Sequence, residues 1–504
     1  MSNKFPKGLI PAALANMGER FGFYTMMAIL VLFLEAKFNL GKTWNSTIYS
    51  VFYAAIYLLA LVGGIIADRT RNYKGTILAG LVVMTVGYAL MALPTSVRSE
   101  NQTLFLILTL IGLLTIALGN GLFKGNLQAL VGQMFDSNPE YAPNRDRGYQ
   151  IFYLFINIGA FFAPFAASFV RNWWLAKHGF LYKAELPSLC HAYLDGKLSG
   201  DELSKFEQLA REVSTVQFTS LQDFAYHYLN TFVTGFHYAF IVSVVAMLVS
   251  LLIYVGYKKM FPDVRKQAKD SSVTREIPVM TKEEIRQRIY ALLAVYVVVL
   301  FFWFSFHQNG LTLTFFAKEY TKLELFGYHI TAEMFQSVNP LLIVILTPLV
   351  IAFFGWLHKR NMEPSTPRKI AIGMFIAALA YSLMTIGSLS LTPPYELKGA
   401  VLPESEKVTP WLLIGTYFIL TIAELFISPL GLSFVSKVAP PQYQGLMQGG
   451  WLGATAVGNQ LLLIGGILYQ KLPLAATWSV FVVVCLISMT MMFLMLRWLE
   501  KFAK

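Results

Sequence analysis

The chain has 504 residues, of which 56% are hydrophobic and only 13% are Asp, Glu, Lys or Arg. Soluble domains average about 25% charged residues, so this composition excludes an ordinary soluble protein and indicates a protein of the lipid bilayer. The formal net charge of +12 does not indicate a nucleic-acid partner. The positive residues gather in loops on one side of the apolar segments, as the positive-inside rule describes.

Twelve apolar segments are long enough to cross a bilayer as helices. An even number of helices places both termini on one side, and the basic loops identify that side as the cytoplasm. We therefore expect a multi-pass protein of the cell membrane (inner or plasma membrane). The predicted spans are 9–35, 46–68, 76–93, 103–133, 148–171, 234–256, 286–316, 331–356, 368–392, 408–437, 445–470 and 474–497.

Two polar stretches interrupt this series. The first, 172–233, lies on the outer side and contains amphipathic patterns such as Asp201 to Arg211, so we expect a small extracytoplasmic helical insertion. The second is a basic cytoplasmic linker that divides the helices six and six. The expected organisation is helices 1–5 of the N-terminal bundle in 1–171, the insertion in 172–233, helix 6 in 234–256, the linker in 257–285 and the C-terminal bundle in 286–504.

Two six-helix halves joined by a cytoplasmic linker resemble the major facilitator transporters. Their substrate site lies between the halves near the middle of the membrane. The sequence thus predicts an all-α membrane protein of that fold, with a site to which both halves contribute.

Four ionisable residues lie deep inside predicted spans: Glu19, Arg20, Lys124 and Glu424. A charge at that depth costs roughly 2.5–3.5 kcal/mol, but two acids and two bases can offset one another if they converge. A contact between Lys124 and Glu424 would tie the halves together in one state and release them in another. The alternative is a static pair that only determines packing.

Three titratable residues are candidates for proton coupling. A carboxylate beside a movable cation can bind a proton when the pair opens, which makes Glu19 and Glu424 candidates. His307 interrupts an aromatic run in the predicted seventh helix. A lone histidine there is usually a packing residue, but histidine is the side chain that titrates near neutral pH.

Other polar and aromatic residues have a packing interpretation beside a binding one. Asn157 can bond a neighbouring helix or a substrate, and Asn339 precedes the helix breaker Pro340, which frees carbonyls for a cavity. Trp451 can stack on a substrate or fill the core. The sequence has no Walker loop, His-Glu-x-x-His motif or Cys-x-x-Cys pair. We therefore expect neither an enzyme nor a bound metal or cofactor.

Several motifs together resemble the proton-dependent oligopeptide transporter family, a branch of the major facilitator superfamily. The family signature E-x-x-E-R-F-x-Y-Y of the first helix stands here as Asn16 to Tyr24. The resemblance implies import of di- and tripeptides by alternating access, driven by the proton gradient. The further matches are Tyr57 before Gly63, the runs 121–126, 152–159, 336–340 and 424–433, and Trp451.

The resemblance also implies which residues meet the peptide. Arg20 and Lys124 can hold its carboxylate, while Glu424 and two amides can hold its amino terminus. The implied substrate-binding residues are Arg20, Tyr24, Tyr57, Lys124 and Asn157 from the first half, and Asn339, Glu424, Ser428 and Trp451 from the second. The implied proton-coupling residues are Glu19, Glu424 and His307.

Three positions depart from the family pattern. Asn16 replaces the first acid of the signature, and Met27 and His307 stand where the family often has an arginine and an acid that form an outer gate. We therefore hypothesise that His307 has taken over a proton or gating role. The departures keep three alternatives open: another small substrate, an uncoupled carrier or exchanger, and a peptide sensor.

Overall fold

The structure is a computed structural model that describes residues 5–98, 100–183, 186–262, 280–310, 312–329, 335, 337–397, 402–403 and 405–502. Among these residues, twelve helical segments are long and apolar enough to cross a membrane. The predicted number of spans is therefore confirmed.

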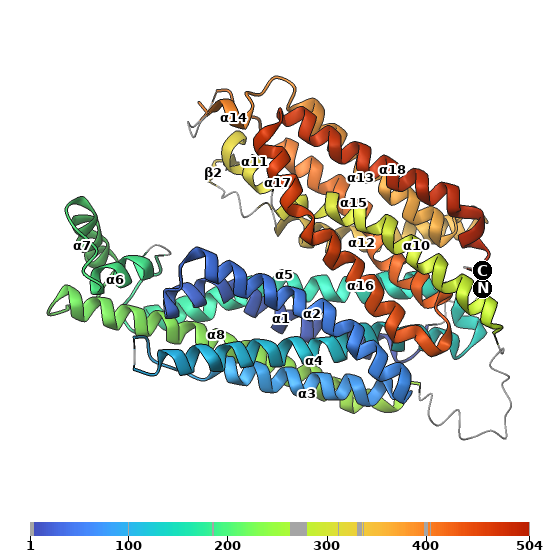
Figure 1. Ribbon diagram of the computed structural model, residues 1–504, viewed down its shortest axis with the longest axis horizontal. Helices are drawn as coiled ribbons and strands as arrows, with labels where there is room; N and C mark the ends of the chain where they lie inside the picture. The colour runs from blue at the N-terminus through green and yellow to red at the C-terminus, as the bar shows by residue number, and fades with distance from the viewer. Residues whose placement is uncertain are drawn as a thin grey trace.

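The long helices form two bundles that lie side by side along the molecule (Figure 1). In the first bundle, α1 packs against α5 and α8, and α3 packs against α4 and α8. Its helices are α1 (Leu9–Phe38), α2 (Gly41–Thr70), α3 (Tyr73–Ala92), α4 (Gln102–Asp136), α5 (Arg145–Lys177) and α8 (Leu221–Tyr257).

The second bundle follows in the second half of the chain, where α13 packs against α15 and α18, and α10 packs against α16 and α18. The two-bundle fold predicted from the sequence is thus confirmed. Its helices are α10 (Lys282–Phe306), α11 (Thr312–Tyr320), α12 (Val338–Lys359), α13 (Thr366–Gly387), α15 (Pro410–Val438), α16 (Gln444–Gln460), α17 (Leu462–Lys471) and α18 (Leu474–Glu500).

Short elements connect the long helices. They are η1 (Pro139–Asn144), α6 (Leu186–Leu194), α7 (Asp201–Val213), η2 (Lys258–Met260), η3 (His307–Gly310), β1 (Glu324–Leu325), β2 (Tyr328–His329), α14 (Pro394–Leu397) and η5 (Pro441–Tyr443). The two strands pair as a small antiparallel hairpin.

The first helix begins and the last helix ends at the same end of the molecule (Figure 1). We call this the terminal end and the opposite one the far end. At the terminal end, α2 and α3 are joined by a tight turn in which Arg71 has a left-handed φ of 50°. The Asn72 side chain then accepts a hydrogen bond from the Gly75 amide (3.1 Å) and begins α3. This turn holds Asp68 and Tyr73 side by side, and their side chains are hydrogen-bonded.

Glycines let the helices of the first bundle approach closely. A Cβ atom on Gly63 of α2 would lie 2.1 Å from the Gly121 carbonyl oxygen of α4, which no larger residue can tolerate. Such close backbone contacts are typical of membrane helices, whose association depends on packing rather than on burial from water. The same pair of helices brings Lys124 of α4 over the Tyr57 ring of α2.

The predicted seventh helix, 286–316, is broken in the structure. It ends as α10 at Phe306, turns through η3 and resumes as α11. The buried Gln308 side chain donates to the Phe304 carbonyl (3.2 Å) and accepts from the Thr312 hydroxyl (3.1 Å). Side-chain bonds of this kind compete with the regular helix ladder. His307 therefore lies just beyond α10 rather than inside one continuous helix.

The predicted eleventh helix, 445–470, is also broken, between α16 and α17 at Leu461. The two breaks touch, because a Cβ atom on Gly465 of α17 would lie 2.3 Å from the Gln308 side-chain nitrogen. Interrupted helices at a common level are tolerated in membrane proteins where the backbone is buried in protein or lines a cavity.

The segment between α5 and α8 lies at the far end, where α6 and α7 form the helical pieces expected there (Figure 1). The predicted sixth helix begins earlier, at Leu221 rather than 234, so α8 extends beyond the bundle. Most of the basic linker, 263–279, lies outside the described residues, as does Gln336 of the 336–340 motif.

This segment is docked on the first bundle. The Nε2 atom of His191 in α6 donates to the Ala36 carbonyl of α1 (2.8 Å), and burial lowers the pKa of His191. Asp195 pairs with Arg98 in the α3–α4 loop (2.7 Å). Arg98 and then Lys197 hold the pKa of Asp195 below its usual range.

Candidate substrate-binding site between the two bundles

Glu19 and Arg20 form a closed ion pair within α1. The Arg20 Nε and Nη2 atoms donate to the two Glu19 carboxylate oxygens, each at 2.5 Å, and Asn120 of α4 adds a third donor at 2.8 Å. The Glu19 side chain is completely buried. Bidentate pairing of this kind is among the strongest polar contacts in proteins. These bonds occupy both carboxylate oxygens of Glu19. The Arg20 guanidinium also lies over the rings of Phe23 and Tyr24, at 4.6 and 6.0 Å from their centroids.

Lys124 of α4 presents its ammonium group to the ring of Tyr57 on α2. The Nζ atom lies 5.2 Å from the ring centroid, within the range of a cation–π contact. No carboxylate of the described residues forms an ion pair with Lys124. The Lys124 ammonium group is therefore available for an anionic ligand.

Glu424 of α15 is held by neutral donors from both bundles. The Tyr153 hydroxyl of α5 donates to Oε1 (2.5 Å), and the Asn339 amide of α12 donates to Oε2 (2.8 Å). Asn339 also donates to the Thr421 hydroxyl (3.0 Å), and Asn157 donates to the Tyr153 carbonyl (3.0 Å). Glu424 is thus a buried acid that receives hydrogen bonds from both bundles.

The sequence interpretation missed Tyr153, although it lies in the 152–159 run that carries the family resemblance. Its role depends on a contact between α5 and α15, and spacing along one helix does not reveal such a contact. The structure brings together Tyr153, Asn157, Asn339 and Glu424 as one group, and Tyr57 with Lys124 as another.

Lys124 and Glu424 do not pair in this structure, because within the described ranges neither side chain forms an ion pair. Each charge lies on a different bundle and is stabilised by neutral partners. The expected contact between them is not made in this structure, and its formation in another state stays a prediction.

Ser428 lies close to Glu424 along α15, whereas Trp451 lies on α16. Ser428 follows Glu424 by one turn of α15 and is buried. Trp451 of α16 packs directly on Gly431, where a Cβ atom would lie 2.0 Å from its ring. Its ring is also edge-on to Tyr296, with centroids 6.4 Å apart. These contacts are those of a tryptophan that packs α16 against α15 and α10.

His307 does not join either charged group. Its Nδ1 atom bonds the Trp303 carbonyl (3.2 Å), and its ring stacks on the Trp303 ring with centroids 4.8 Å apart. The side chain is partly exposed. The structure therefore places His307 on the second bundle only, in the break between α10 and α11.

At the terminal end, the two bundles are in contact through α2 and α16. The carboxylate of Asp68 accepts hydrogen bonds from the Gly445 and Leu446 amides, at 2.9 and 2.8 Å, and is also bonded by Tyr73. These amides belong to the first turn of α16, where free N–H groups and the helix dipole favour a negative charge. A Cβ atom on Gly64 would lie 2.5 Å from the Gly445 carbonyl, so the helices are in direct contact.

A second closure joins α5 to α13 and α15. Asp146 accepts from Lys369 (3.0 Å) and Lys437 (2.8 Å), and these are the ion pairs that connect the two bundles in the described part of the chain. The hydroxyls of Ser433 (2.6 Å) and Thr366 (2.9 Å) complete its shell. The bundles thus meet tightly at the terminal end, and they diverge toward the far end (Figure 1).

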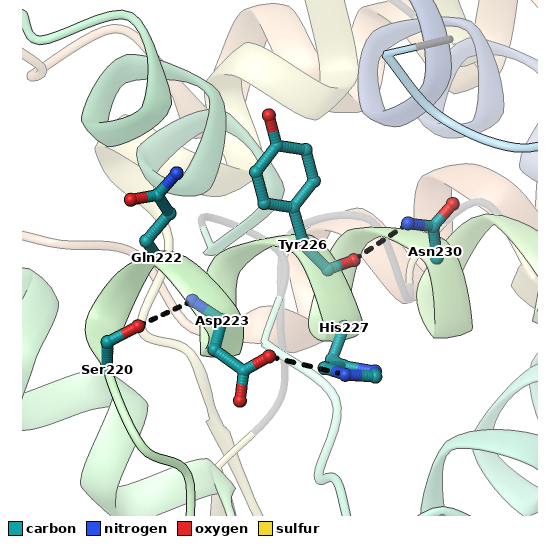
Figure 2. Close-up of a pocket in the computed structure, with 6 residues that line it drawn as sticks. All are labelled: Ser220, Gln222, Asp223, Tyr226, His227 and Asn230. Carbon is teal, nitrogen blue, oxygen red and sulfur yellow. Dashed lines mark hydrogen bonds and ion pairs between the residues drawn. The ribbon is translucent and has the colours of Figure 1, made fainter.

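A separate polar pocket of about 340 Å³ lies on the first turns of α8, near the far end. Figure 2 shows its side chains along one helix, with Asp223 paired to His227 at 3.4 Å. None of the predicted site residues lines it. Its lining consists of Ser220, Gln222, Asp223, Tyr226, His227 and Asn230.

Comparison with known proteins identifies the family. The sequence profile of the POT family matches residues 74–285 and 264–471. The chain belongs to the POT family. This result confirms the resemblance noted in the sequence motifs.

Curated relatives cover most of the chain. A peptide transporter of Yersinia enterocolitica, YePEPT, is 27% identical over 478 residues, which are 90% of this chain and 86% of the relative. Dipeptide and tripeptide permease A of Escherichia coli is 27% identical over 471 residues, with 92% and 84% covered. An uncharacterized transporter of Bacillus subtilis, YclF, is 25% identical over 489 residues, with 93% and 89% covered.

Solved structures share the fold. A peptide transporter POT in complex with sulfate has a TM-score of 0.59 at 22% identity, with 99% of this chain and 96% of that chain covered. A POT family transporter in complex with 5-aminolevulinic acid has a TM-score of 0.60 at 21% identity, with 99% and 97% covered.

Because the ion pairs of Asp146 join the two bundles, a single substitution at this residue tests their role. Asp146→Asn leaves Lys437 without its acid and Lys369 with Glu363 alone, so the two bundles lose the charge that joins them. We expect the variant to open at the terminal end. Spin labels on the first turns of α5 and α13 should report a longer distance by double electron–electron resonance.

The matched control is Glu363→Gln, because Glu363 bonds Lys369 (2.8 Å) from the same bundle and does not join the two halves. It should leave the label distance unchanged. An unchanged distance in Asp146→Asn would show that this cluster does not hold the terminal end closed.

Proposed function

We propose that the chain is a proton-coupled symporter that imports di- and tripeptides by alternating access. One observation carries the proposal. Lys124 on the first bundle has no ion-pair partner among the described residues, and Glu424 on the second accepts bonds only from the neutral Tyr153 and Asn339 side chains. The two bundles that carry these charges are in contact at the terminal end. A zwitterionic ligand can satisfy both charges at once, and the relatives named as di- and tripeptide permeases agree with such a ligand.

The proposed binding roles follow from charge. Lys124 and Arg20 bind the peptide carboxylate, with Tyr24 and Tyr57 beside them. Glu424 binds the amino terminus. Asn339, which already bonds Glu424, and Asn157, one turn after Tyr153, supply carbonyl and amide groups for the peptide backbone. Ser428 and Trp451 form the wall of the site on the second bundle. Because every peptide carries both terminal charges, such a site accepts many side chains.

The terminal end is cytoplasmic in this proposal, because the basic loops lie there. The structure then represents a state that is closed to the cytoplasm by Asp68 and Asp146. The segment with α6 and α7 lies outside the cell and moves with the first bundle, to which His191 and Asp195 attach it. Rocking of the bundles about the site opens the cytoplasmic end and releases the peptide.

Proton coupling is assigned to Glu424, Glu19 and His307. As a carboxylate, Glu424 accepts bonds from Tyr153 of one bundle and Asn339 of the other. Protonation turns one of its oxygens into a donor and so changes the contact between the bundles. Glu19 is the second acid, and its release requires Arg20 to turn toward the peptide.

Uptake of labelled dialanine and trialanine into proteoliposomes tests the proposed function. We expect accumulation above the equilibrium level when an inward proton gradient is imposed, and only equilibration without one. Glu424→Gln should abolish the gradient-driven part because the acid that joins the bundles no longer titrates.

A solute without terminal charges serves as the control for leakage. Exchange of peptide without gradient-driven accumulation would identify an uncoupled carrier. No movement of either peptide by folded wild-type protein would contradict peptide transport and direct attention to another small substrate.

His307 is tested separately. If it takes part in coupling, His307→Ala lowers gradient-driven uptake at least about threefold, because the break between α10 and α11 loses its titratable group. Peptide exchange without a gradient should be preserved. His307→Gln retains a polar side chain and serves as the comparison for packing. Full pH-dependent uptake by His307→Ala excludes the role.

A further inference from the structure

Gln150 of α5 carries a buried amide that has no hydrogen-bond partner. Only 1% of the residue is exposed, and within the described ranges neither its side-chain nitrogen nor its side-chain oxygen is bonded. Turning the amide over would not create a bond, because neither atom has a partner. Buried polar groups are almost always bonded, since an amide that leaves water without a new partner costs free energy. This exception requires a physical reason.

Gln150 lies on the face of α5 that meets the second bundle. Residues three and four positions apart are neighbours on the surface of a helix. Asp146, four residues before it, forms ion pairs with α13 and α15. Arg147, three residues before it, lies beside α12, where a Cβ atom on Gly355 would be 3.6 Å from its Nη2 atom. Tyr153, three residues after it, donates to a carboxylate of α15 at 2.5 Å. All three neighbours thus contact the second bundle.

The opposing surface explains why the amide is unbonded. Tyr153 packs against apolar residues of α12 and α15. From that level toward the terminal end, the next two turns of these helices are 347–353 and 426–432, in which only Thr347 and Ser428 have polar side chains. The Thr347 hydroxyl donates to a carbonyl of its own helix at 2.6 Å. The amide therefore meets mainly apolar surface where the bundles are in contact.

The free-energy cost of this amide belongs to the closed arrangement of the terminal end. When that end opens, α5 separates from α12 and α15, and water can bond the amide. The unbonded amide therefore raises the free energy of the closed state relative to the open state. It acts against the ion pairs of Asp146, one turn away, which hold the same helices together.

We propose that Gln150 keeps the terminal end able to open, because its unbonded amide destabilises the closed state. An apolar residue at this position would stabilise closure and slow release of the substrate. This inference rests on the proposed alternating-access function, in which the terminal end opens in every transport cycle.

Double electron–electron resonance on the full-length protein in lipid nanodiscs tests the inference, with the label pair described above for Asp146→Asn. Gln150→Met keeps nearly the same side-chain length and removes the amide. We expect the ratio of closed to open molecules to rise about fivefold or more, as for the removal of one unbonded buried polar group. The ratio is measured in the otherwise wild-type chain and together with Asp146→Asn, where the open population is expected to be larger.

Two substitutions of equal size at the same position separate the amide from side-chain volume. Gln150→Leu and Gln150→Asn have nearly the same shape, but only the second keeps an amide. We expect Gln150→Leu to favour closure as Gln150→Met does, and Gln150→Asn to resemble the wild-type protein. This pair decides the question even if Gln150→Met folds poorly.

Tyr88 of α3 offers a control at another position. It is completely buried, and its hydroxyl has no partner in the described part of the chain. However, α3 packs against α4 and α8 within the first bundle. Tyr88→Phe thus removes an unbonded polar group that does not lie between the bundles, and it should leave the label distances unchanged.

The outcomes separate this inference from the proposed function. Unchanged populations in Gln150→Met and Gln150→Leu, or an equal shift in Gln150→Leu and Gln150→Asn, would show that the amide does not control opening. Uptake of dialanine is measured on the same proteins and should be slower in Gln150→Met. If the wild-type protein transports no peptide while Gln150→Met still favours closure, peptide transport is wrong and the role of Gln150 stands. If the wild-type protein transports dialanine and the populations do not change, only the role of Gln150 is wrong.

Discussion

The structure depends on two opposite charges that lie inside the membrane without pairing. Lys124 on the first bundle is stabilised by the Tyr57 ring, and Glu424 on the second by the Tyr153 hydroxyl and the Asn339 amide. A buried charge in a bilayer is costly unless it is paired or solvated. Leaving both charges unpaired on facing bundles costs free energy, and a zwitterionic ligand bound between them would offset part of that cost. That cost connects the fold to binding.

The contacts that hold the terminal end closed are made by residues other than these two charges. Closure there uses backbone contact at Gly64 and Gly125, a carboxylate on a helix N-terminus at Asp68, and the ion cluster around Asp146. None of these uses Lys124 or Glu424. The end therefore closes without the two charges proposed to bind the ligand. Separate closure and binding groups are what an alternating-access cycle needs.

Much of this arrangement could be predicted from the sequence. Hydropathy predicts the twelve spans, and the depth of Glu19, Arg20, Lys124 and Glu424 in apolar helices marks them as candidate site residues. Contacts between distant helices could not be predicted in this way. Tyr153 and Asp146 resemble their neighbours in the sequence of α5, and their partners on α13 and α15 are found only when the bundles are placed together. The break at His307 was missed for a related reason, since it depends on bonds of the Gln308 side chain that leave the apolar pattern intact.

The most direct test of the account pairs altered ligands with altered residues. Binding of dialanine, N-acetyl-dialanine and dialanine amide is measured for wild type, Glu424→Gln and Lys124→Gln. The wild-type protein is expected to bind each modified ligand at least about tenfold more weakly than dialanine, a difference of about 1.4 kcal/mol. Glu424→Gln should be indifferent to N-acetylation, and Lys124→Gln to amidation. If each modification costs the same in all three proteins, the two charges do not recognise the two ends of the peptide, and the central claim is wrong.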